Sequence, residues 1–224
     1  MTMKRVPLLL ASIVAVLLFG ALVYLKSQPN PWEPDIAKFT QADAAHPPPR
    51  DAVWFIGSSS IVKWSTLAAD FPGVPVINRG FGGSHLSDSV HFADRIAIPY
   101  QPRIVVLYAG DNDLWSGKTP ERVLKDFQMF AAKIHRGVPK ARLIYLAIKP
   151  SPSRWSIRDQ IVRTNQLIAA ECARDSRDAF LDIYTPMLDA KGEPRPELFE
   201  PDMLHMNAKG YAIWAPLLAP LLGK

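Results

Sequence analysis

Short apolar runs of strand length recur along the chain after residue 50, and segments with helical spacing separate them. One run, residues 104–108, is apolar throughout, which is typical of a strand covered on both faces of a parallel sheet. The following five strands are therefore expected: Ala52–Ile56, Val74–Ile77, Arg103–Tyr108, Arg142–Ala147 and Ala179–Ile183.

The intervening segments carry apolar residues at intervals of three and four, the spacing of an amphipathic helix. Thr119 followed by Pro120 indicates a helix start, because threonine caps free N–H groups and proline fits the first turn. Pro216 is expected to bend or split the last helix. Further helices are expected over Ser84–Ala97, Trp155–Arg174 and Asn207–Leu222. This alternation predicts an α/β fold, a three-layer α/β/α sandwich with a five-stranded parallel sheet.

The pattern before this region is different. Residues 6–25 form an apolar run without a charge, and Lys4 and Arg5 precede it. Because about 20 helical residues span a bilayer core, we expect an uncleaved transmembrane helix within residues 1–26. The basic N-terminus would lie in the cytoplasm and the rest outside it, in the periplasm if the membrane is a bacterial inner membrane. The alternative is a signal peptide cleaved near Gly20, which would give a secreted protein.

Residues 27–50 carry six prolines and few apolar residues. This composition predicts a semi-extended spacer that holds a domain away from the membrane. The domain itself is expected to occupy residues 51–224, a length that suits one well-buried core.

Composition limits the possible functions further. The net charge is +5, but three basic residues flank the apolar segment, and no Lys/Arg cluster follows, so a nucleic-acid partner is not expected. Cys172 is the single cysteine, which excludes an intramolecular disulfide, and we expect it to fill a buried helix position. His46, His91 and His135 show no ligand spacing, so neither a metal nor another cofactor is expected.

Four motifs carry the candidate chemistry, and three of them follow predicted strands. They are Gly57-Ser58-Ser59-Ser60, Asn78-Arg79-Gly80-Phe81-Gly82-Gly83, Gly110-Asp111-Asn112-Asp113 and Asp202-Met203-Leu204-His205. The carboxyl ends of parallel strands meet at one edge of a sheet, where ligands bind in such folds. The motifs should therefore meet in one site.

These residues supply the parts that acyl transfer requires. A serine hydroxyl becomes a good nucleophile when a base removes its proton, although strand-end serines also cap helices. His205 is the candidate base, and Asp202 can hold its tautomer. The glycine-rich turn and the Asn112 amide can donate hydrogen bonds to an oxyanion, or serve the loop structure alone.

The motifs resemble, in order and spacing, the conserved blocks of the GDSL-like, or SGNH, hydrolases over residues 52–222. The resemblance implies a flavodoxin-like sandwich and ester hydrolysis. Its implied nucleophile is Ser59, although Ser58 replaces the family's usual aspartate, so Ser60 and Ser58 stay open as alternatives. The remaining implied site residues are Asp202 and His205 of the triad, with Ser59, Gly83 and Asn112 as oxyanion donors.

Several residues beside these motifs have open roles. We expect Asp111 and Asp113 to lie near the cleft mouth, where two carboxylates would disfavour anionic substrates. His85 either begins a helix or lines the pocket. Four tryptophans are expected mostly in the core, and Trp115 has the alternative of walling the acyl site. The four are Trp64, Trp115, Trp155 and Trp214.

Two classes of function fit this reading. The first is an extracytoplasmic serine esterase that cleaves short acyl esters of envelope glycans or lipids, with acyl transfer to an alcohol as a close variant. The second is a catalytically silent domain that binds envelope glycans or a partner protein, supported only by the altered first motif. The complete set of Ser59, Gly83, Asn112, Asp202 and His205 favours the enzyme.

Overall fold

The computed structural model describes residues 30–223. The chain divides into a unit of residues 1–34 and a compact unit of residues 35–224, and the fold of the second unit follows. Its centre is a five-stranded sheet in the order β2-β1-β3-β4-β5, and every pair is parallel. The strands are β1 (Val53–Gly57), β2 (Val76–Gly80), β3 (Ile104–Tyr108), β4 (Arg142–Leu146) and β5 (Asp178–Leu181). All five predicted strands are therefore present, although β2 begins and ends later than expected.

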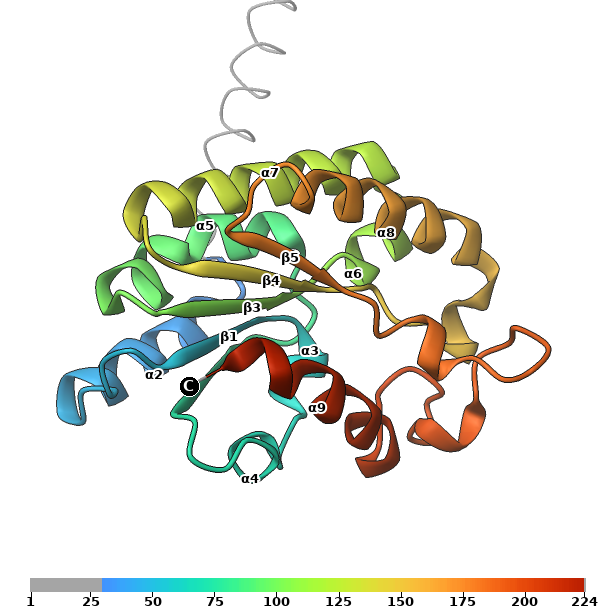
Figure 1. Cartoon of the computed structure of the whole chain (residues 1–224), viewed down its shortest axis with the longest axis horizontal. Coiled ribbons are helices and arrows are strands. Elements are labelled where there is room, and N and C mark those ends of the chain that lie inside the picture. The colour runs from blue at the N-terminus through green and yellow to red at the C-terminus, as the bar shows by residue number, and fades with distance from the viewer. Residues whose placement is uncertain (1–29, 224) are drawn as a thin grey trace, which may run out of the picture. The chain divides into compact units, whose positions relative to one another are not determined.

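Helices cover both faces of this sheet and give the predicted three layers (Figure 1). On one face lie α5 (Leu86–Ile96), α7 (Pro120–Gly137) and α8 (Arg158–Cys172). On the other lies α9 (Ala208–Leu222) with the short α4 (Leu67–Asp70). The remaining helical elements are α2 (Glu33–Ala45), α3 (Ser59–Val62), α6 (Asp111–Trp115), η1 (Ile98–Tyr100), η2 (Pro152–Ile157), η3 (Thr185–Met187) and η4 (Pro196–Leu198).

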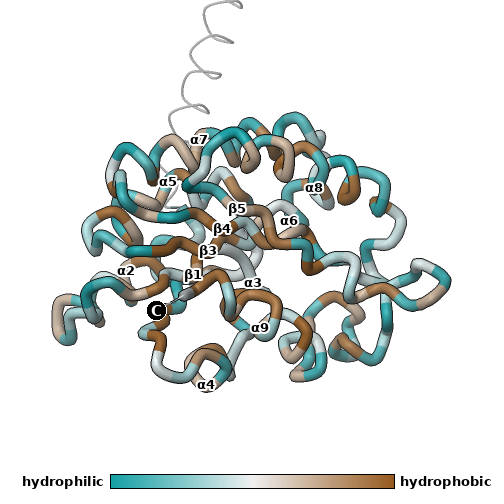
Figure 2. The backbone as a smooth tube through the Cα atoms, in the orientation of Figure 1, coloured by the Kyte–Doolittle hydropathy of each residue, from teal (hydrophilic) through white to brown (hydrophobic). Residues whose placement is uncertain are grey.

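The sheet is buried because its strands are apolar on both faces. Figure 2 shows hydrophobic residues concentrated along the strands, while the outer helices alternate between hydrophobic and hydrophilic residues. On the α9 face, Trp64 stacks on Tyr211 with ring centroids 5.1 Å apart, and Trp214 lies 5.0 Å from Tyr108. On the opposite face, Phe127 of α7 contacts Tyr145 edge-on. Aromatic pairs thus join both helical layers to the strands that carry the site.

The last helix is not split at Pro216, since α9 continues through Pro216 and Pro220 as one element. A proline removes one intrahelical hydrogen bond, which leaves the carbonyl four residues earlier without its donor. Both prolines and Ala212 are exposed, so the carbonyl that Pro216 leaves free faces water. The cost of each proline is therefore low on this side of the helix.

The segment expected to be an extended spacer contains helix α2. No proline or glycine interrupts residues 35–46, and Pro34 stands in the first helical turn, where proline is tolerated. Ile36 is fully buried, and Asp43 pairs with Arg79 of β2 at 2.5 Å. Residues 35–45 therefore pack against the domain and do not act as a spacer.

The expected transmembrane helix lies outside the described residues. Among residues 30–223, no helix is both long and apolar enough to cross a membrane. The anchor therefore stays a prediction from the sequence.

Candidate active site

The site begins where β1 ends, at Gly57. The backbone of Gly57 has φ +144°, and a Cβ added there would lie 1.9 Å from the carbonyl oxygen of Tyr108 on the adjacent β3. Only glycine permits this approach, because any side chain would overlap the neighbouring strand. The chain then turns into α3, and Ser58 N donates to Tyr108 O at 3.1 Å. This turn places Ser59 at the carboxyl edge of the sheet.

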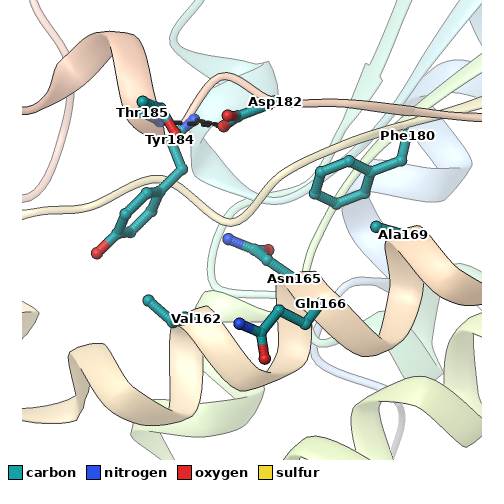
Figure 3. A pocket seen from close by; sticks show the side chains of 8 residues that line it. All are labelled: Val162, Asn165, Gln166, Ala169, Phe180, Asp182, Tyr184 and Thr185. Atoms are coloured by element: carbon teal, nitrogen blue, oxygen red, sulfur yellow. Dashed lines mark hydrogen bonds between the residues drawn. The ribbon is translucent and has the colours of Figure 1, made fainter.

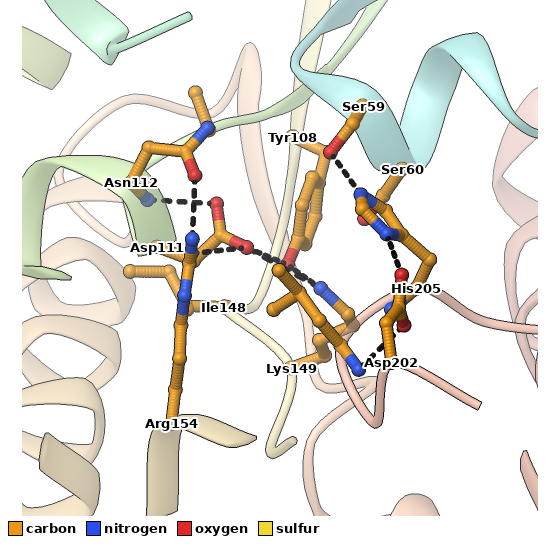
Figure 4. Close-up of polar contacts among 12 residues, drawn as sticks. Ser59, Ser60, Tyr108, Asp111, Asn112, Ile148, Lys149, Arg154, Asp202 and His205 are labelled. Atoms are coloured by element: carbon orange, nitrogen blue, oxygen red, sulfur yellow. Dashed lines mark hydrogen bonds and ion pairs between the residues drawn. The ribbon is translucent and has the colours of Figure 1, made fainter. Parts of the chain in front are cut away.

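The structure brings Ser59, His205 and Asp202 together in one hydrogen-bonded row (Figure 4). The distance from Ser59 Oγ to His205 Nε2 is 3.0 Å, and His205 Nδ1 lies 2.5 Å from Asp202 Oδ2. These two bonds match the arrangement in which a carboxylate orients an imidazole that removes a serine proton. Serine and histidine come from segments 146 residues apart, so the fold creates this arrangement.

The three consecutive serines differ sharply in their surroundings. Ser58 and Ser60 are buried, and neither hydroxyl has a hydrogen-bond partner among the described residues. Ser59 is partly exposed and is the serine that contacts His205. This geometry favours Ser59 over the two alternatives that the altered first motif left open.

Asp202 is fixed by its own loop. Its Oδ1 accepts hydrogen bonds from the backbone N–H groups of Leu204 and His205, both at 2.9 Å. Partial burial acts to raise the pKa of Asp202, but the bonds from the His205 ring and these N–H groups outweigh it and hold the pKa well below its usual range. Asp202 therefore stays a carboxylate at neutral pH and in mild acid.

Asn112 lies in α6, directly after β3, and its amide is held at both ends. Nδ2 donates to the carbonyl oxygen of Ser84 at 3.0 Å, and Oδ1 accepts from Nη2 of Arg154 at 2.9 Å. The glycine turn after β2 lies beside the serine, since a Cβ added at Gly82 would be 3.9 Å from Ser59 Cβ. Gly83 follows with φ +75° and open space where a Cβ would stand.

A buried charge cluster adjoins Asn112, and the sequence did not indicate it. Asp111 Oδ2 lies 3.2 Å from Arg154 Nη1 and 3.3 Å from Lys149 Nζ, which also donates to the Tyr108 hydroxyl at 3.1 Å. Burial acts to raise the pKa of Asp111, but the two cations outweigh this effect, and the pKa is lowered. For Lys149, burial disfavours the charged ammonium and lowers the pKa. The sequence feature that could have indicated these two residues is their position after β4, because this places them at the same edge of the sheet as Asn112.

The prediction that two carboxylates lie near the cleft mouth is wrong. Asp111 and Asp113 are both buried, Asp111 between its two cations and Asp113 0% exposed. Asp113 pairs with Lys118 at 2.6 Å and accepts from the N–H of Leu86 at the start of α5. Both carboxylates are thus neutralised inside the domain, because buried charges are stable only with partners. They give no reason to expect discrimination against anionic substrates.

The structure also shows where the predicted tryptophans and His85 lie. Trp64 and Trp214 lie in the core, as expected, and Trp155 is partly buried. Trp115 is 54% exposed, so the core assignment is wrong for it, and its ring lies 5.7 Å from the Arg154 guanidinium carbon. His85 caps α5 through a capping box with Asp88, which confirms its helix-start role.

Two other features lie apart from this arrangement. A shallow pocket of about 290 Å³ between α8 and the end of β5 is lined by residues such as Val162, Phe180 and Tyr184 (Figure 3). His135 Nε2 lies 2.6 Å from Asp178 Oδ1, with Asp175 close by. Both oxygens of Asp175 accept from Arg177, which already neutralises that carboxylate. Neither feature includes a residue of the four motifs.

Comparisons with known proteins identify the family of the chain. The model of the GDSL-like Lipase/Acylhydrolase family matches residues 54–213. No curated protein matches the chain.

Solved structures share the fold. A GDSL-like lipase from Bacteroides thetaiotaomicron has TM-score 0.71 and 22% identity, over 84% of this chain and 96% of that one. A Bacteroides fragilis protein described provisionally as an acylhydrolase has TM-score 0.76 and 20% identity, over 87% and 98%. A variant of an acetyl-xylooligosaccharide esterase from Geobacillus stearmophilus has TM-score 0.62 and 15% identity, over 78% and 94%. At these identities the likeness shows the fold alone.

Proposed function

The chain belongs to the GDSL-like lipase/acylhydrolase family and is an ester-hydrolysing enzyme, and we propose that it is a serine esterase for short acyl esters outside the cytoplasm. The observation that carries this proposal is the row of Ser59, His205 and Asp202, joined by hydrogen bonds of 3.0 and 2.5 Å. A silent binding domain has no need of a serine hydroxyl aligned with an imidazole and a carboxylate.

The geometry supports the following acylation step. His205 Nε2 accepts the proton of Ser59 Oγ while Oγ bonds to the ester carbonyl carbon, and the imidazolium is stabilised by Asp202. The carbonyl oxygen becomes an oxyanion, for which the backbone N–H groups of Ser59 and Gly83 and Nδ2 of Asn112 are the proposed donors. The tetrahedral intermediate collapses, the ester C–O bond breaks, and His205 gives its proton to the leaving alkoxide oxygen.

Deacylation uses the same groups in reverse. Water loses a proton to His205 Nε2 and attacks the acyl carbon, and the bond to Ser59 Oγ breaks. His205 returns the proton to Oγ, and the carboxylic acid leaves. If an alcohol replaces water in this step, the same residues perform acyl transfer.

A fluorophosphonate probe tests the nucleophile without a choice of substrate. We expect the purified full chain to form an adduct on Ser59, located by peptide mass spectrometry, and His205→Ala to lose it because no base remains. Lys63→Ala, an exposed change four residues along, serves as the control and should label normally. An adduct on Ser58 or Ser60, or none on the folded chain, would contradict the assignment.

The proposed substrate range rests on the expected compartment, where acylated envelope glycans and lipids occur. The acetyl-xylooligosaccharide esterase shows that this fold accommodates acetyl esters of sugars in another protein. We expect kcat/KM to fall as the acyl group of a p-nitrophenyl ester lengthens from acetyl to octanoyl. A rise with chain length would contradict the short-chain proposal while leaving the nucleophile untouched.

The compartment itself has a separate test. Antibody detection after cell fractionation should find the full-length chain in washed membranes, with its domain digested by protease added from outside. A soluble form that begins near residue 22 would favour signal-peptide cleavage instead.

A further inference from the structure

Arg154 lies directly beneath the amide of Asn112 and is not one of the family motifs described above. It belongs to η2, which follows β4, and it is 8% exposed. Its guanidinium contacts two residues at once, since Nη2 donates a hydrogen bond to Asn112 Oδ1 at 2.9 Å and Nη1 forms an ion pair with Asp111 Oδ2 at 3.2 Å (Figure 4). A planar guanidinium fork suits this double contact, whereas a lysine ammonium is a single point charge.

The contacts of Asn112 select one of the two orientations of its amide. In the observed orientation, Nδ2 donates to the Ser84 carbonyl and Oδ1 accepts from Arg154. A half-turn of the amide would set the NH₂ group against the Arg154 donors and Oδ1 against the Ser84 carbonyl oxygen. Each mismatch leaves a buried polar group unsatisfied, at a cost of about 1–3 kcal/mol. The observed orientation is therefore strongly favoured.

This orientation determines where the amide donates. An asparagine amide carries two N–H donors, and Ser84 takes one of them among the described residues. The second N–H stays available to an oxygen outside the chain. A donor acts in the transition state only if it is aimed in advance at the place where negative charge develops.

Arg154 is itself held in place from three sides. Asp111 is a buried carboxylate with a lowered pKa, so it gives the guanidinium a fixed anionic partner. The Trp115 ring lies 5.7 Å away, and the Arg154 backbone N–H donates to Ser151 O at 3.1 Å. Lys149, on the other side of Asp111, anchors the carboxylate in turn.

We propose that Arg154 is a positioning residue of the esterase, which fixes the Asn112 amide so that one Nδ2–H points at the oxyanion. This inference rests on the proposed function, in which Ser59 is the nucleophile and Asn112 an oxyanion donor. It extends the machinery from the family motifs to a side chain on the segment after β4.

A double-mutant cycle tests the inference with p-nitrophenyl acetate. We expect Arg154→Met to lower kcat about 10- to 100-fold with KM changed less than about 3-fold, because the lost interaction acts in the transition state. Asn112→Ala should lower kcat about 100-fold or more. In the Asn112→Ala background, Arg154→Met should cost less than about 2-fold, since its target is already absent.

Arg154→Lys keeps a positive charge beside Asp111, but its single ammonium group cannot pair with Asp111 and also donate to Asn112 Oδ1, so it should also lose most of kcat. This variant keeps the test valid if Arg154→Met does not fold. Arg158→Met is the matched control, because Arg158 also lies over a tryptophan, with its guanidinium carbon 5.5 Å from the Trp155 ring, but pairs with exposed Asp159. It should keep full kcat.

The outcomes separate the inference from the proposed function. If the wild-type chain forms no adduct on Ser59 and cleaves no ester, the proposed function fails. If the wild type is active and Arg154→Lys keeps its kcat, the positioning role is overturned. Equal losses from Arg154→Met in the Asn112 and Asn112→Ala backgrounds would also overturn it, because Arg154 would then not act through Asn112.

Discussion

Asp111 illustrates how one residue joins stability to chemistry. Its carboxylate lies between Lys149 and Arg154 and also accepts from the Asn112 backbone N–H at 2.9 Å. Two cations around one anion would be costly to bury without that anion, because an uncompensated buried charge loses its hydration. The same carboxylate therefore stabilises the fold and holds the group beneath the Asn112 amide.

Asp111→Asn should destabilise the protein by about 3–5 kcal/mol, because it leaves two buried cations without their partner. Urea unfolding followed by circular dichroism measures this change. Asp94→Asn is the control, since Asp94 pairs with Lys133 at 2.7 Å on the surface, with its side chain 65% exposed. That change should cost about 1 kcal/mol or less. Similar values for the two variants would show that the buried cluster contributes little.

At the residue scale, the sequence indicated the residues of the candidate site and missed the charged side chains that pack beside them. Ser59, Asn112 and His205 stood out because their motifs follow strands or show a familiar spacing, and the structure brings them to one edge. Lys149 and Arg154 meet Asp111 across about 40 residues of sequence, and no local pattern records such a contact. Whether a buried acid pairs with a distant base is decided by packing alone.

At the scale of elements, the turn from β1 into α3 controls the position of Ser59, the proposed nucleophile. The backbone of Gly57 passes so close to β3 that a side chain would overlap the Tyr108 carbonyl. The strand register fixes this approach, because Gly57 is paired with Gly80 on one side and Tyr108 on the other. A displaced turn would carry Ser59 away from His205.

Gly57→Ala should therefore cost about 3 kcal/mol or more and abolish fluorophosphonate labelling of Ser59. Gly73→Ala is the matched control, because Gly73 also has a positive φ, +80°, but open space where a Cβ would stand. It should cost about 1–2 kcal/mol and leave labelling intact. Thermal unfolding measures the loss of stability, and probe labelling measures the reactivity of Ser59. Equal effects of the two substitutions on both measurements would contradict a special role for the β1 turn.

The sheet and its main helices were predictable because their apolar periodicity extends over whole elements. The errors came where local signals compete with tertiary contacts. Prolines around residues 27–50 masked the helical segment of α2, whose Ile36 is buried against the domain. Pro216 predicted a bend or a split in α9, and the helix is not split, because the exposed position of Pro216 makes the lost hydrogen bond inexpensive.

At the scale of the whole molecule, buried tyrosines make the stability of the fold depend on pH in the alkaline range. Burial raises the pKa of Tyr108, Tyr145 and Tyr211 above their ordinary value. A raised pKa in the folded state gives stability that is complete below about pH 10 and is lost as the pH rises further. Lys149, whose pKa burial lowers, acts in the opposite sense, and the tyrosines outnumber it.

The melting temperature should therefore fall steadily above about pH 10. The tyrosinate absorbance of these three rings should appear together with loss of the far-ultraviolet dichroism, since the buried rings ionise only when the chain opens. Tyr211→Phe, which removes one of these hydroxyls, should make the fall less steep. Full tyrosine ionisation near pH 10 in a chain with native dichroism would contradict this account.

The order of the site residues along the chain has a consequence for biosynthesis. The ribosome makes Ser59 first, Asn112 later, and His205 last, 146 residues after the serine. Trp214 and Leu218, which complete the core beneath the sheet, follow later still. A nascent chain thus carries a serine without its base, and a prematurely released one stays inert toward the esters of the cell that makes it. A product that ends before residue 202 cannot form the hydrogen bonds that join Ser59, His205 and Asp202.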